Sequence, residues 1–389
     1  MKKPKLIRIT TVPISLEKLL EGQLGFMNKY FGVTAISSEK QRLEKYGKNE
    51  GVATFYLPLT RKITPIRDVI SVIKLYKFLK KENPSIVHTH TPKAGIIGMM
   101  AAFLARVPLR LHTVAGLPLL EAKGLKRIVL NQVEKLTYRL ATKVYPNSKG
   151  LNDIILSEKF TTINKLKVIG NGSTNGIDIA YFSKTYFSEV DLNNKRNELN
   201  IPVDDFVFVF VGRIVKDKGI NELIEAFIKL QNSSLLTSHF SLLLVGPFED
   251  DLDPISEKTK TTIANNPKII ATGYKIDVRI YYAISNAFVF PSYREGFPNA
   301  VMQAGAMELP SIVSNINGCN EIIEDGKNGI IIPSKNKELL FNKMKVLLND
   351  AVLLNNLSAN SRELIKNRFE RDFIWKSILD EYKILLENL

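Results

Sequence analysis

A carboxylate, a glycine and a proline follow one another between a strand pattern and a helical pattern, in the run Glu295-Gly296-Phe297-Pro298-Asn299. The fixed φ of Pro298 suits the first position of a helix, so we expect a helix to begin there. Gly296 permits a tight bend and lets a ligand approach the backbone closely. The free N–H groups of a first helical turn favour an anion. The run therefore predicts a place for a phosphorylated, hydroxyl-rich ligand, with Glu295 at its mouth.

A second group of charged residues follows another apolar run, residues 206–211. Arg213 and Lys218 lie in the loop after it, between Gly212 and Gly219. Ligands of open α/β sheets bind at the carboxyl ends of the strands, and two fixed cations there could neutralise a diphosphate without a metal. Taken alone, such a pair is usually two solvated surface charges. Its pairing with the Glu295 loop, at the corresponding end of a later strand, favours a binding site.

Short apolar, β-rich runs alternate with helical patterns through both halves of the chain. Continuous apolar runs between helices are typical of parallel sheets buried on both faces, and 389 residues are too many for one ordinary core. The sequence therefore predicts an α/β protein with two doubly wound domains, residues 1–190 and 191–370, and a final helix over 371–389. The predicted strands are 6–12, 33–37, 86–90, 109–114, 143–147, 206–211, 240–245, 269–273, 287–291, 311–314 and 329–333.

Charge is distributed unevenly along the chain. The net charge is +15, but residues 1–190 hold 31 Lys and Arg against 13 Asp and Glu, whereas the rest holds 23 against 26. This asymmetry indicates an anionic partner for the first half: nucleic acid, a membrane surface or a phosphorylated acceptor. The single cysteine fits a reducing compartment. Because no apolar run reaches about 18 residues and no secretion signal is evident, we expect a cytoplasmic location.

The two charged groups together carry a resemblance to a known family. Gly212-Arg213 and Lys218-Gly219, followed by residues 295–299, resemble the retaining glycosyltransferases of sequence family 4. The resemblance covers nearly the whole chain, and bacterial enzymes that build capsule, lipopolysaccharide and similar surface polymers on lipid carriers look most similar. It implies the GT-B arrangement, in which two Rossmann-like domains face each other across a cleft and the last helix crosses back to the first domain.

The resemblance also implies roles for the residues of the second domain. Arg213 and Lys218 would hold the donor diphosphate and stabilise its departure, and Glu295 would contact hydroxyls of the transferred sugar; these three are the predicted catalytic residues. The backbone of Gly296, Phe297, Pro298 and Asn299 would face sugar and phosphate. Gln303 stands where the family usually has a glutamate for the ribose, and a neutral amide gives a weaker bond there. Gly273 and Tyr274 would lie against the base.

The first domain departs from the family more clearly. Many members have a histidine just before the glycine that is Gly116 here, but this chain has Ala115. His112 is the remaining candidate on the acceptor side, although alternation along a strand puts it on the face opposite Ala115. Gly22 could admit the donor phosphate by close backbone approach, or it could simply start a helix.

Three further patterns have two interpretations each. Asp251-Leu252-Asp253 could hold a metal, but Asp253 is better explained as a helix N-cap. His88 and His90 share a strand face and could bind a metal, but the sequence indicates no third ligand, so we expect both to be structural histidines. The helix predicted over residues 66–82 has a stripe of Ile66, Val69, Ile70, Ile73 and Tyr76, which favours packing on the first sheet; its lysines could instead rest on anionic lipid.

Together these observations predict an enzyme that moves a hexosyl or N-acetylhexosaminyl group, with retention, from a nucleotide diphosphate sugar to a hydroxyl of a lipid-linked saccharide. UDP is the expected nucleotide, with no cofactor and no obligatory metal. The first domain would receive the acceptor and touch the inner face of the plasma membrane; the oligomeric state stays open. The alternatives are a GT-B nucleotide-sugar epimerase and a basic nucleic-acid-binding protein. The second has no recognition motif in its favour, so no nucleic acid partner is expected.

Overall fold

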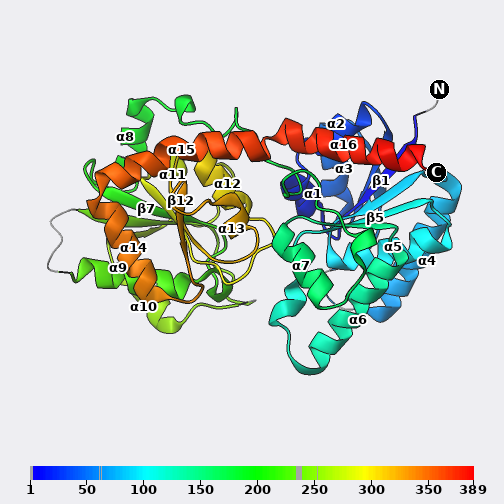
Figure 1. Ribbon diagram of the computed structural model, residues 1–389, viewed down its shortest axis with the longest axis horizontal. Coiled ribbons are helices and arrows are strands. Elements are labelled where there is room, and N and C mark those ends of the chain that lie inside the picture. Colours follow the sequence, from blue (N-terminus) through cyan, green and yellow to red (C-terminus); the bar gives the residue numbers. More distant parts are fainter. Residues whose placement is uncertain (1–2, 61, 63, 234–238, 252) are drawn as a thin grey trace. The chain divides into compact units, whose positions relative to one another are not determined.

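The computed structural model describes residues 3–60, 62, 64–233, 239–251 and 253–389. Packing divides the chain into two compact units. Unit 1 consists of Met1–Gly176 and Arg371–Leu389, and unit 2 consists of Ile177–Glu370. Each unit contains one parallel sheet with helices on its faces (Figure 1). The predicted α/β fold with two doubly wound sheets is thus confirmed.

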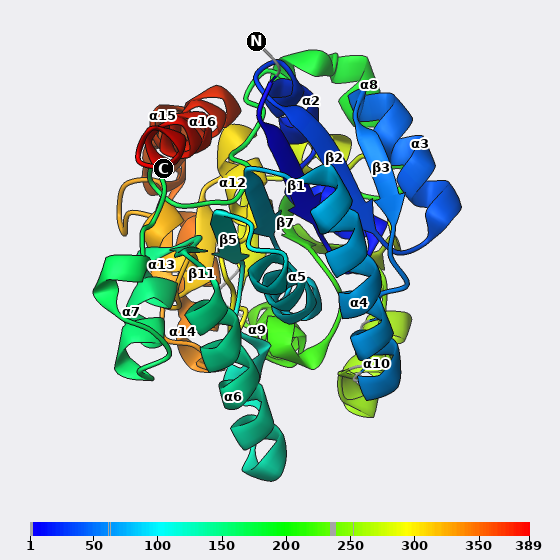
Figure 2. The same ribbon diagram turned by 90° about the vertical axis from the view of Figure 1, so that its right-hand side faces the viewer.

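The sheet of unit 1 has the strand order β3-β2-β1-β4-β5-β6, and all its pairs are parallel. Its strands are β1 (Lys5–Ile9), β2 (Gly32–Ser37), β3 (Ala53–Tyr56), β4 (Ile86–Thr89), β5 (Leu109–Val114) and β6 (Lys143–Pro146). Its helices before the junction are α1 (Pro13–Leu19), α2 (Gln23–Asn28), α3 (Lys40–Glu50), α4 (Pro65–Glu82), α5 (Pro92–Leu104), α6 (Gly124–Leu140) and α7 (Lys149–Ser157). The apolar helix α5 lies between α4 and α6 (Figure 2). None of the helices in the described part of the chain is both long and apolar enough to span a bilayer.

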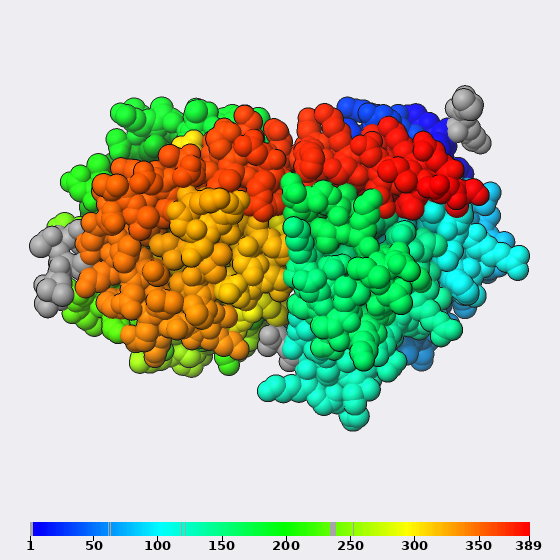
Figure 3. Space-filling view, in the orientation of Figure 1, coloured from blue at the N-terminus to red at the C-terminus, as the bar shows by residue number. Residues whose placement is uncertain are grey.

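The last helix, α16 (Arg371–Glu387), belongs to unit 1 and lies along its surface (Figure 3). Its apolar stripe enters the same core as Leu24, Met27 and Phe31 of the first 31 residues; the stripe consists of Ile374, Ile378, Leu379 and Tyr382. Tyr382 is fully buried, and its hydroxyl contacts both Arg8 and His88. The predicted return of the C-terminal helix is therefore confirmed, and unit 1 is built from both ends of the chain.

The sheet of unit 2 has the order β12-β11-β10-β7-β8-β9, again with parallel pairs. Its strands are β7 (Phe206–Val211), β8 (Phe240–Val245), β9 (Ile269–Ala271), β10 (Ala287–Phe290), β11 (Ser311–Ser314) and β12 (Gly329–Ile332). Its helices are α8 (Glu189–Glu198), α9 (Ile220–Gln231), α10 (Glu257–Asn265), α11 (Arg279–Ala283), α12 (Asn299–Ala306), α13 (Cys319–Ile322), α14 (Lys337–Asn349) and α15 (Ala351–Phe369). The alternating Phe and Val side chains of β7 are almost all buried, as expected for a strand covered by helices on both faces.

The boundary between the units lies earlier than the sequence prediction placed it. Residues 177–190, assigned to the first domain from sequence, pack in unit 2 because Ile177, Ile179 and Phe182 enter its core. The N–H of Ile177 donates to the carbonyl oxygen of Phe369, at 2.8 Å. The two chain segments that connect the units therefore lie next to each other where they meet unit 2.

Helix α4 corrects one sequence interpretation. Most of the predicted core stripe is exposed instead: Ile66 is 80% exposed, and Val69, Ile70 and Ile73 are also open to solvent, whereas Tyr76 is partly buried against the core. The helix packs through a second row, which consists of Ser71, Val72, Leu75 and Leu79. Both rows are mostly apolar, so periodicity did not determine which one faces the sheet.

Candidate functional site

The two charged groups predicted from the sequence meet at the centre of the second sheet. β7 and β10 are neighbours there, and the strand order reverses between them. Such a reversal is where ligands bind outside the carboxyl ends of the strands. Arg213 follows β7 and Glu295 follows β10, so the topology brings the two loops to the same edge of unit 2.

Lys218 and Glu295 form an ion pair between the Lys218 ammonium and Oε1 of Glu295. Each side chain is only 14% exposed. The hydroxyl of Ser292 donates to the same carboxylate oxygen at 2.9 Å, and the ammonium lies 5.5 Å from the ring centroid of Phe290. Both charges are thus held in place before any ligand arrives.

Arg213 is paired with Glu249, with Nη1 2.8 Å from Oε2. Burial lowers the pKa of the guanidinium, but the hydrogen bond to Glu249 and the charges of Glu249, Asp217 and Glu295 together outweigh that effect, and the net shift is upward. Arg213 therefore stays charged. Because its side chain is 40% exposed, it can turn from Glu249 to an arriving phosphate. No role for Glu249 could be predicted from the sequence, because only the fold brings the loop after β8 beside the loop after β7.

The loop that carries Lys218 is anchored through Asp217. Arg294 pairs with the Asp217 carboxylate at 2.9 Å, and the Asp217 carbonyl oxygen accepts from the N–H of Tyr293 at 2.8 Å. The N–H of Asp217 in turn donates to Oδ2 of Asp253 at 2.6 Å. These contacts fasten the loops after β7 and β10 to each other, which fixes the position of Lys218 relative to Glu295.

The interpretation of Asp253 as a helix N-cap is wrong. Helix α10 starts later, with Ser256 as its N-cap, and the hydroxyl of Ser256 accepts from the N–H of Thr259 at 3.2 Å. Asp253 instead binds the loop that carries Lys218. Its carboxylate accepts from the N–H of Asp217, and its carbonyl oxygen accepts from the N–H of Lys216. The middle residue of that run, Leu252, lies outside the described residues. Within the described ranges, no group of three or more His, Cys, Asp or Glu side chains has the geometry to hold a metal ion.

Helix α12 begins one residue later than predicted. Pro298 is its N-cap, with ψ of 113°, and Asn299 is the first helical residue. In the described part of the chain, the N–H groups of Gly296, Phe297, Asn299 and Ala300 have no hydrogen-bond acceptor. These donors are therefore available to an anion at the start of the helix.

The loop after β11 supports this helix start. The side-chain amide of Asn317 donates to the carbonyl oxygen of Glu295. Gly318 has φ of 77°, and a Cβ there would collide with the backbone of Gly296 and Phe297. Neither Asn317 nor Gly318 was predicted from the sequence; the glycine after Asn317 was the available signal for a close backbone approach.

The residues predicted to meet the nucleotide lie on neighbouring elements of unit 2. The side-chain oxygen of Gln303 on α12 accepts from the hydroxyl of Tyr282 at 3.3 Å, which leaves its amide NH₂ to donate. Tyr274 is 57% exposed, and Gly273 before it has φ of 69°, where a Cβ would meet no other atom within 4 Å. The carbonyl oxygen of Gly273 accepts from the N–H of Gly246 at 3.0 Å, which fixes the end of β9 against that of β8.

The two site candidates in unit 1, Gly22 and His112, are both packed against other side chains of that unit. The N–H of Gly22 donates to Glu50 at 2.8 Å, and a Cβ at this residue would collide with the ring of Trp375. His112 is 3% exposed and lies beneath α5, with Nδ1 2.7 Å from the hydroxyl of Thr89. Burial lowers the pKa of His112 to about 4, so its ring is neutral. Packing thus accounts for both residues in this structure.

Comparison with known proteins identifies both halves of the chain. Residues 31–172 match the family model described as a glycosyl transferase 4-like domain, and residues 191–364 match that of glycosyl transferases group 1. The chain is 34% identical over 389 residues to the capsular polysaccharide biosynthesis glycosyltransferase CapM of Staphylococcus aureus, covering 100% of this chain and 99% of CapM. It is 32% identical to the UDP-Gal:alpha-D-GlcNAc-diphosphoundecaprenol alpha-1,3-galactosyltransferase of Escherichia coli, covering 88% of this chain and 86% of that enzyme.

Solved structures agree on the fold. A glycosyltransferase from Rickettsia africae superposes with a TM-score of 0.81 at 20% identity, covering 100% of both chains. Anabaena HepE in complex with UDP-glucose gives 0.80 at 17% identity, covering 98% of this chain and 99% of HepE. Since family models match both halves and CapM is matched along its whole length, the chain belongs to the GT-B glycosyltransferases, with a 4-like domain followed by a group 1 domain.

Proposed function

We propose that this glycosyltransferase moves a sugar from a UDP-sugar to a hydroxyl of a lipid-linked saccharide during surface polysaccharide synthesis, with retention of configuration as in family 4. The names of two relatives support the acceptor and the pathway: CapM acts in capsular polysaccharide biosynthesis, and the Escherichia coli relative is named for a diphosphoundecaprenol acceptor. UDP as the nucleotide is supported by the name of that second relative and by HepE, which was solved with UDP-glucose.

The observation that carries this proposal is the convergence of Arg213, Lys218 and the α12 helix start at one edge of the second sheet. In the proposed reaction the bond between the sugar C1 and the diphosphate oxygen breaks, and the acceptor oxygen bonds to C1. The acceptor proton passes to the departing phosphate oxygen. The two cations and the free N–H groups offset the negative charge that develops on this leaving group. Glu295 positions the sugar through its hydroxyl groups.

The same groups explain why we propose no obligatory metal. A divalent cation usually neutralises a diphosphate leaving group, but here a guanidinium, an ammonium and a helix N-terminus can supply that charge. Gln303 would donate its free amide N–H to the nucleotide ribose, and exposed Tyr274 would lie against the base.

The deciding experiment is a panel of nucleotide sugars tested with and without a lipid-linked saccharide acceptor. We expect nucleotide release only when UDP-sugar and acceptor are both present, with the anomeric configuration of the donor found in the product by NMR. Activity should persist in EDTA. Consumption of donor without acceptor would favour the epimerase instead, and release of nucleotide only from non-uridine donors would refute UDP.

Glu249→Ala should strengthen nucleotide binding, because this carboxylate competes with phosphate for Arg213. A partly exposed ion pair is worth up to about 1 kcal/mol, so we expect a gain of up to about fivefold in UDP affinity. Calorimetric titration of UDP into both proteins measures it. Asp250→Ala is a suitable control, because Asp250 lies next to Glu249 but pairs with Lys260 instead. Weaker binding by Glu249→Ala would mean that Glu249 positions Arg213 and does not compete with phosphate.

We further propose that unit 1 touches an anionic membrane surface, at the inner face of the plasma membrane, through the exposed face of α4. At 100° per residue, the exposed apolar residues at its start and the lysines at its end share one face. The apolar residues are Ile66, Val69, Ile70 and Ile73, and the lysines are Lys74, Lys77, Lys80 and Lys81. α6, on the other side of α5, also exposes Leu125, Ile128 and Val129 (Figure 2). An apolar row beside a basic row suits the boundary between lipid headgroups and acyl chains.

Removing the three last lysines of this face should weaken membrane binding about a hundredfold, because each lysine near an anionic surface contributes about 1 kcal/mol. The variant is Lys77→Ala, Lys80→Ala, Lys81→Ala, measured by co-sedimentation with phosphatidylglycerol-containing vesicles. A control with three exposed lysines of unit 2 removed, Lys258, Lys327 and Lys335, should bind as the parent does. Equal loss in both variants would argue against this surface.

A further inference from the structure

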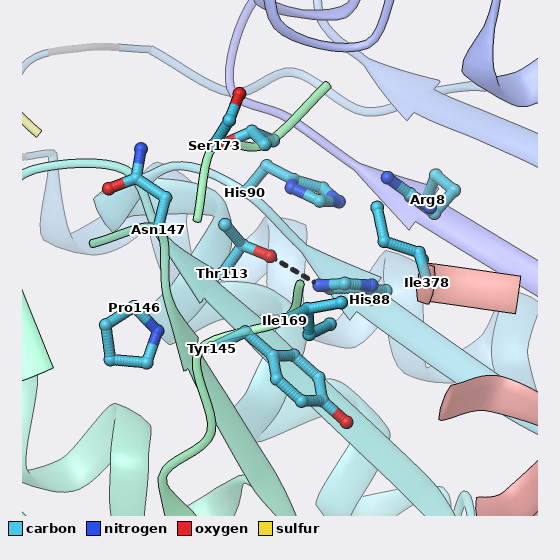
Figure 4. A pocket seen from close by; sticks show the side chains of 11 residues that line it. Arg8, His88, His90, Thr113, Tyr145, Pro146, Asn147, Ile169, Ser173 and Ile378 are labelled. Carbon is cyan, nitrogen blue, oxygen red and sulfur yellow. Dashed lines mark hydrogen bonds between the residues drawn. The ribbon is translucent and has the colours of Figure 1, made fainter. Parts of the chain in front are cut away.

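Unit 1 contains a small cavity, lined in part by polar side chains, at the carboxyl ends of its central strands. Arg8 lies on β1, His88 on β4 and Thr113 on β5, while His90 and Asn147 directly follow β4 and β6 (Figure 4). The strand order of this sheet reverses between β1 and β4, the same kind of position as the donor site of unit 2. The remaining lining residues are Tyr145, Pro146, Ile169, Ser173, Thr174 and Ile378.

Arg8 brings a positive charge into this cavity wall with no counter-charge. Its side chain is fully buried, and its two terminal nitrogens contact the hydroxyl of Tyr382 at 2.8 Å and the amide oxygen of Gln23 at 2.5 Å. Both partners are neutral, and among the described residues no carboxylate forms an ion pair with Arg8. Burying an uncompensated charge is costly. An anion in the cavity would supply the missing compensation.

His90 shows that the cavity also lacks hydrogen-bond partners. Its ring is 2% exposed, and neither ring nitrogen has a hydrogen-bond partner within the described chain. The ring of His88 stacks on it, and both nitrogens of His88 do have hydrogen-bond partners. Other cavity residues also have buried, unpartnered atoms: Nε of Arg8, Oδ1 of Asn147 and Oγ1 of Thr174. Buried polar groups in folded proteins are nearly always paired, so several orphans around one cavity indicate a missing polar occupant. Burial and then the charge of Arg8 lower the pKa of His90 well below its usual value, so the ring is neutral and can donate only one N–H.

We propose that this cavity binds an oxyanion, a single phosphate or carboxylate group, through Arg8, His90, Thr174 and Asn147. The guanidinium Nε–H, one imidazole N–H and the threonine hydroxyl can donate to it. Asn147 donates once its amide turns so that Nδ2 takes the place of the unpartnered Oδ1. The cavity volume is about 20 Å³, which excludes a sugar ring and limits the occupant to a group of a few atoms. All residues that line the cavity belong to unit 1, and the proposal does not depend on which donor or acceptor the enzyme uses.

The test uses inorganic phosphate and the histidine signals of the full chain. The protein has four histidines, so ¹⁵N-histidine labelling gives a spectrum in which each ring can be followed. We expect phosphate to shift the ring signals of His90, and of His88 stacked on it, and to leave those of exposed His239 unchanged. The titration is repeated in Lys218→Ala, because the donor site also attracts phosphate; the His90 shift should survive in that variant.

Two variants separate binding from folding. His90→Leu removes both unpartnered nitrogens, so it should leave the melting temperature unchanged or raise it while phosphate affinity falls at least tenfold. Thr174→Val removes one donor without changing the side-chain shape and should lower the affinity severalfold. Loss of stability in His90→Leu, together with no His90 shift in the parent from either inorganic phosphate or a phosphate-bearing acceptor analogue, would show that the cavity holds only structural water and would overturn the proposal.

A second arm identifies the source of the oxyanion. A phosphate carried by the acceptor and free inorganic phosphate share the same chemistry, so the histidine titration is repeated with a short-chain prenyl diphosphate saccharide. A His90 shift with inorganic phosphate but not with the acceptor analogue assigns the site to a free anion. A shift only with the acceptor analogue assigns it to the acceptor's phosphate. If neither ligand moves the His90 signals, the proposal is wrong, whatever the enzyme's activity.

Discussion

Replacing Lys218 by alanine should lower kcat for sugar transfer by about 10²- to 10³-fold, the usual effect of removing one group that stabilises developing negative charge. The ammonium is held beside Glu295 with little exposure, so it needs no rearrangement to face the leaving group. Steady-state kinetics with UDP-sugar and acceptor measures the effect. The fold should stay intact, because the anchoring contacts of the loop come from Asp217 and Asp253 and do not involve the Lys218 side chain.

Lys216→Ala is the matched control for this prediction. Lys216 lies on the same loop, and its side chain is exposed. It should retain kcat within about twofold, since surface substitutions of this kind have small effects. A Lys218→Ala enzyme with full activity, or an equal loss in both variants, would rule out a specific role for the Lys218 ammonium.

Replacing Glu295 by alanine should lower kcat/KM by about 10- to 150-fold. The substitution removes a charged acceptor for sugar hydroxyls, worth about 1.5–3 kcal/mol, and it also leaves Lys218 without its partner. Glu295→Gln keeps the shape and one acceptor oxygen, so it should lose less. Glu257→Ala, on an exposed carboxylate of α10, should behave like the parent.

The double variant Lys218→Ala, Glu295→Ala tests whether the pair acts as a unit. Residues in direct contact rarely have additive effects, so the double variant should be little worse than the more damaging single variant. Strictly multiplied losses would mean that the two side chains act independently, and the ion pair would then be incidental.

The strands of both sheets could be predicted well from the sequence, because a strand buried on both faces leaves a continuous apolar run. The bounds of β5, β7, β8 and β11 agree at both ends with the prediction. The prediction missed β3, which is an edge strand with a partly exposed pattern and no apolar run. β1 ends at Ile9 and not at Val12, since the chain turns into α1 after the sheet edge.

The candidate site was predictable where its residues lie at strand ends in recognisable runs, as Arg213, Lys218 and Glu295 do. Their partners were not, because Glu249 and Asn317 reach the site through loops whose paths depend on tertiary packing. The prediction of which face of α4 packs on the sheet was wrong for a different reason. The exposed row and the buried row lie on adjacent faces of the helix, and both are apolar enough to pack against a core.

The return of α16 to unit 1 has a consequence for synthesis on the ribosome. Unit 1 emerges first, yet its core remains open until Ile374, Ile378 and Tyr382 have been translated. Until then the guanidinium of Arg8 lacks its hydrogen bond to the Tyr382 hydroxyl. The apolar side chains of α2 that pack against α16 are also exposed to solvent in the nascent chain. The half of the enzyme that is made first is therefore completed last, and the nascent protein must protect that surface, by chaperone or by transient collapse, while unit 2 is being made.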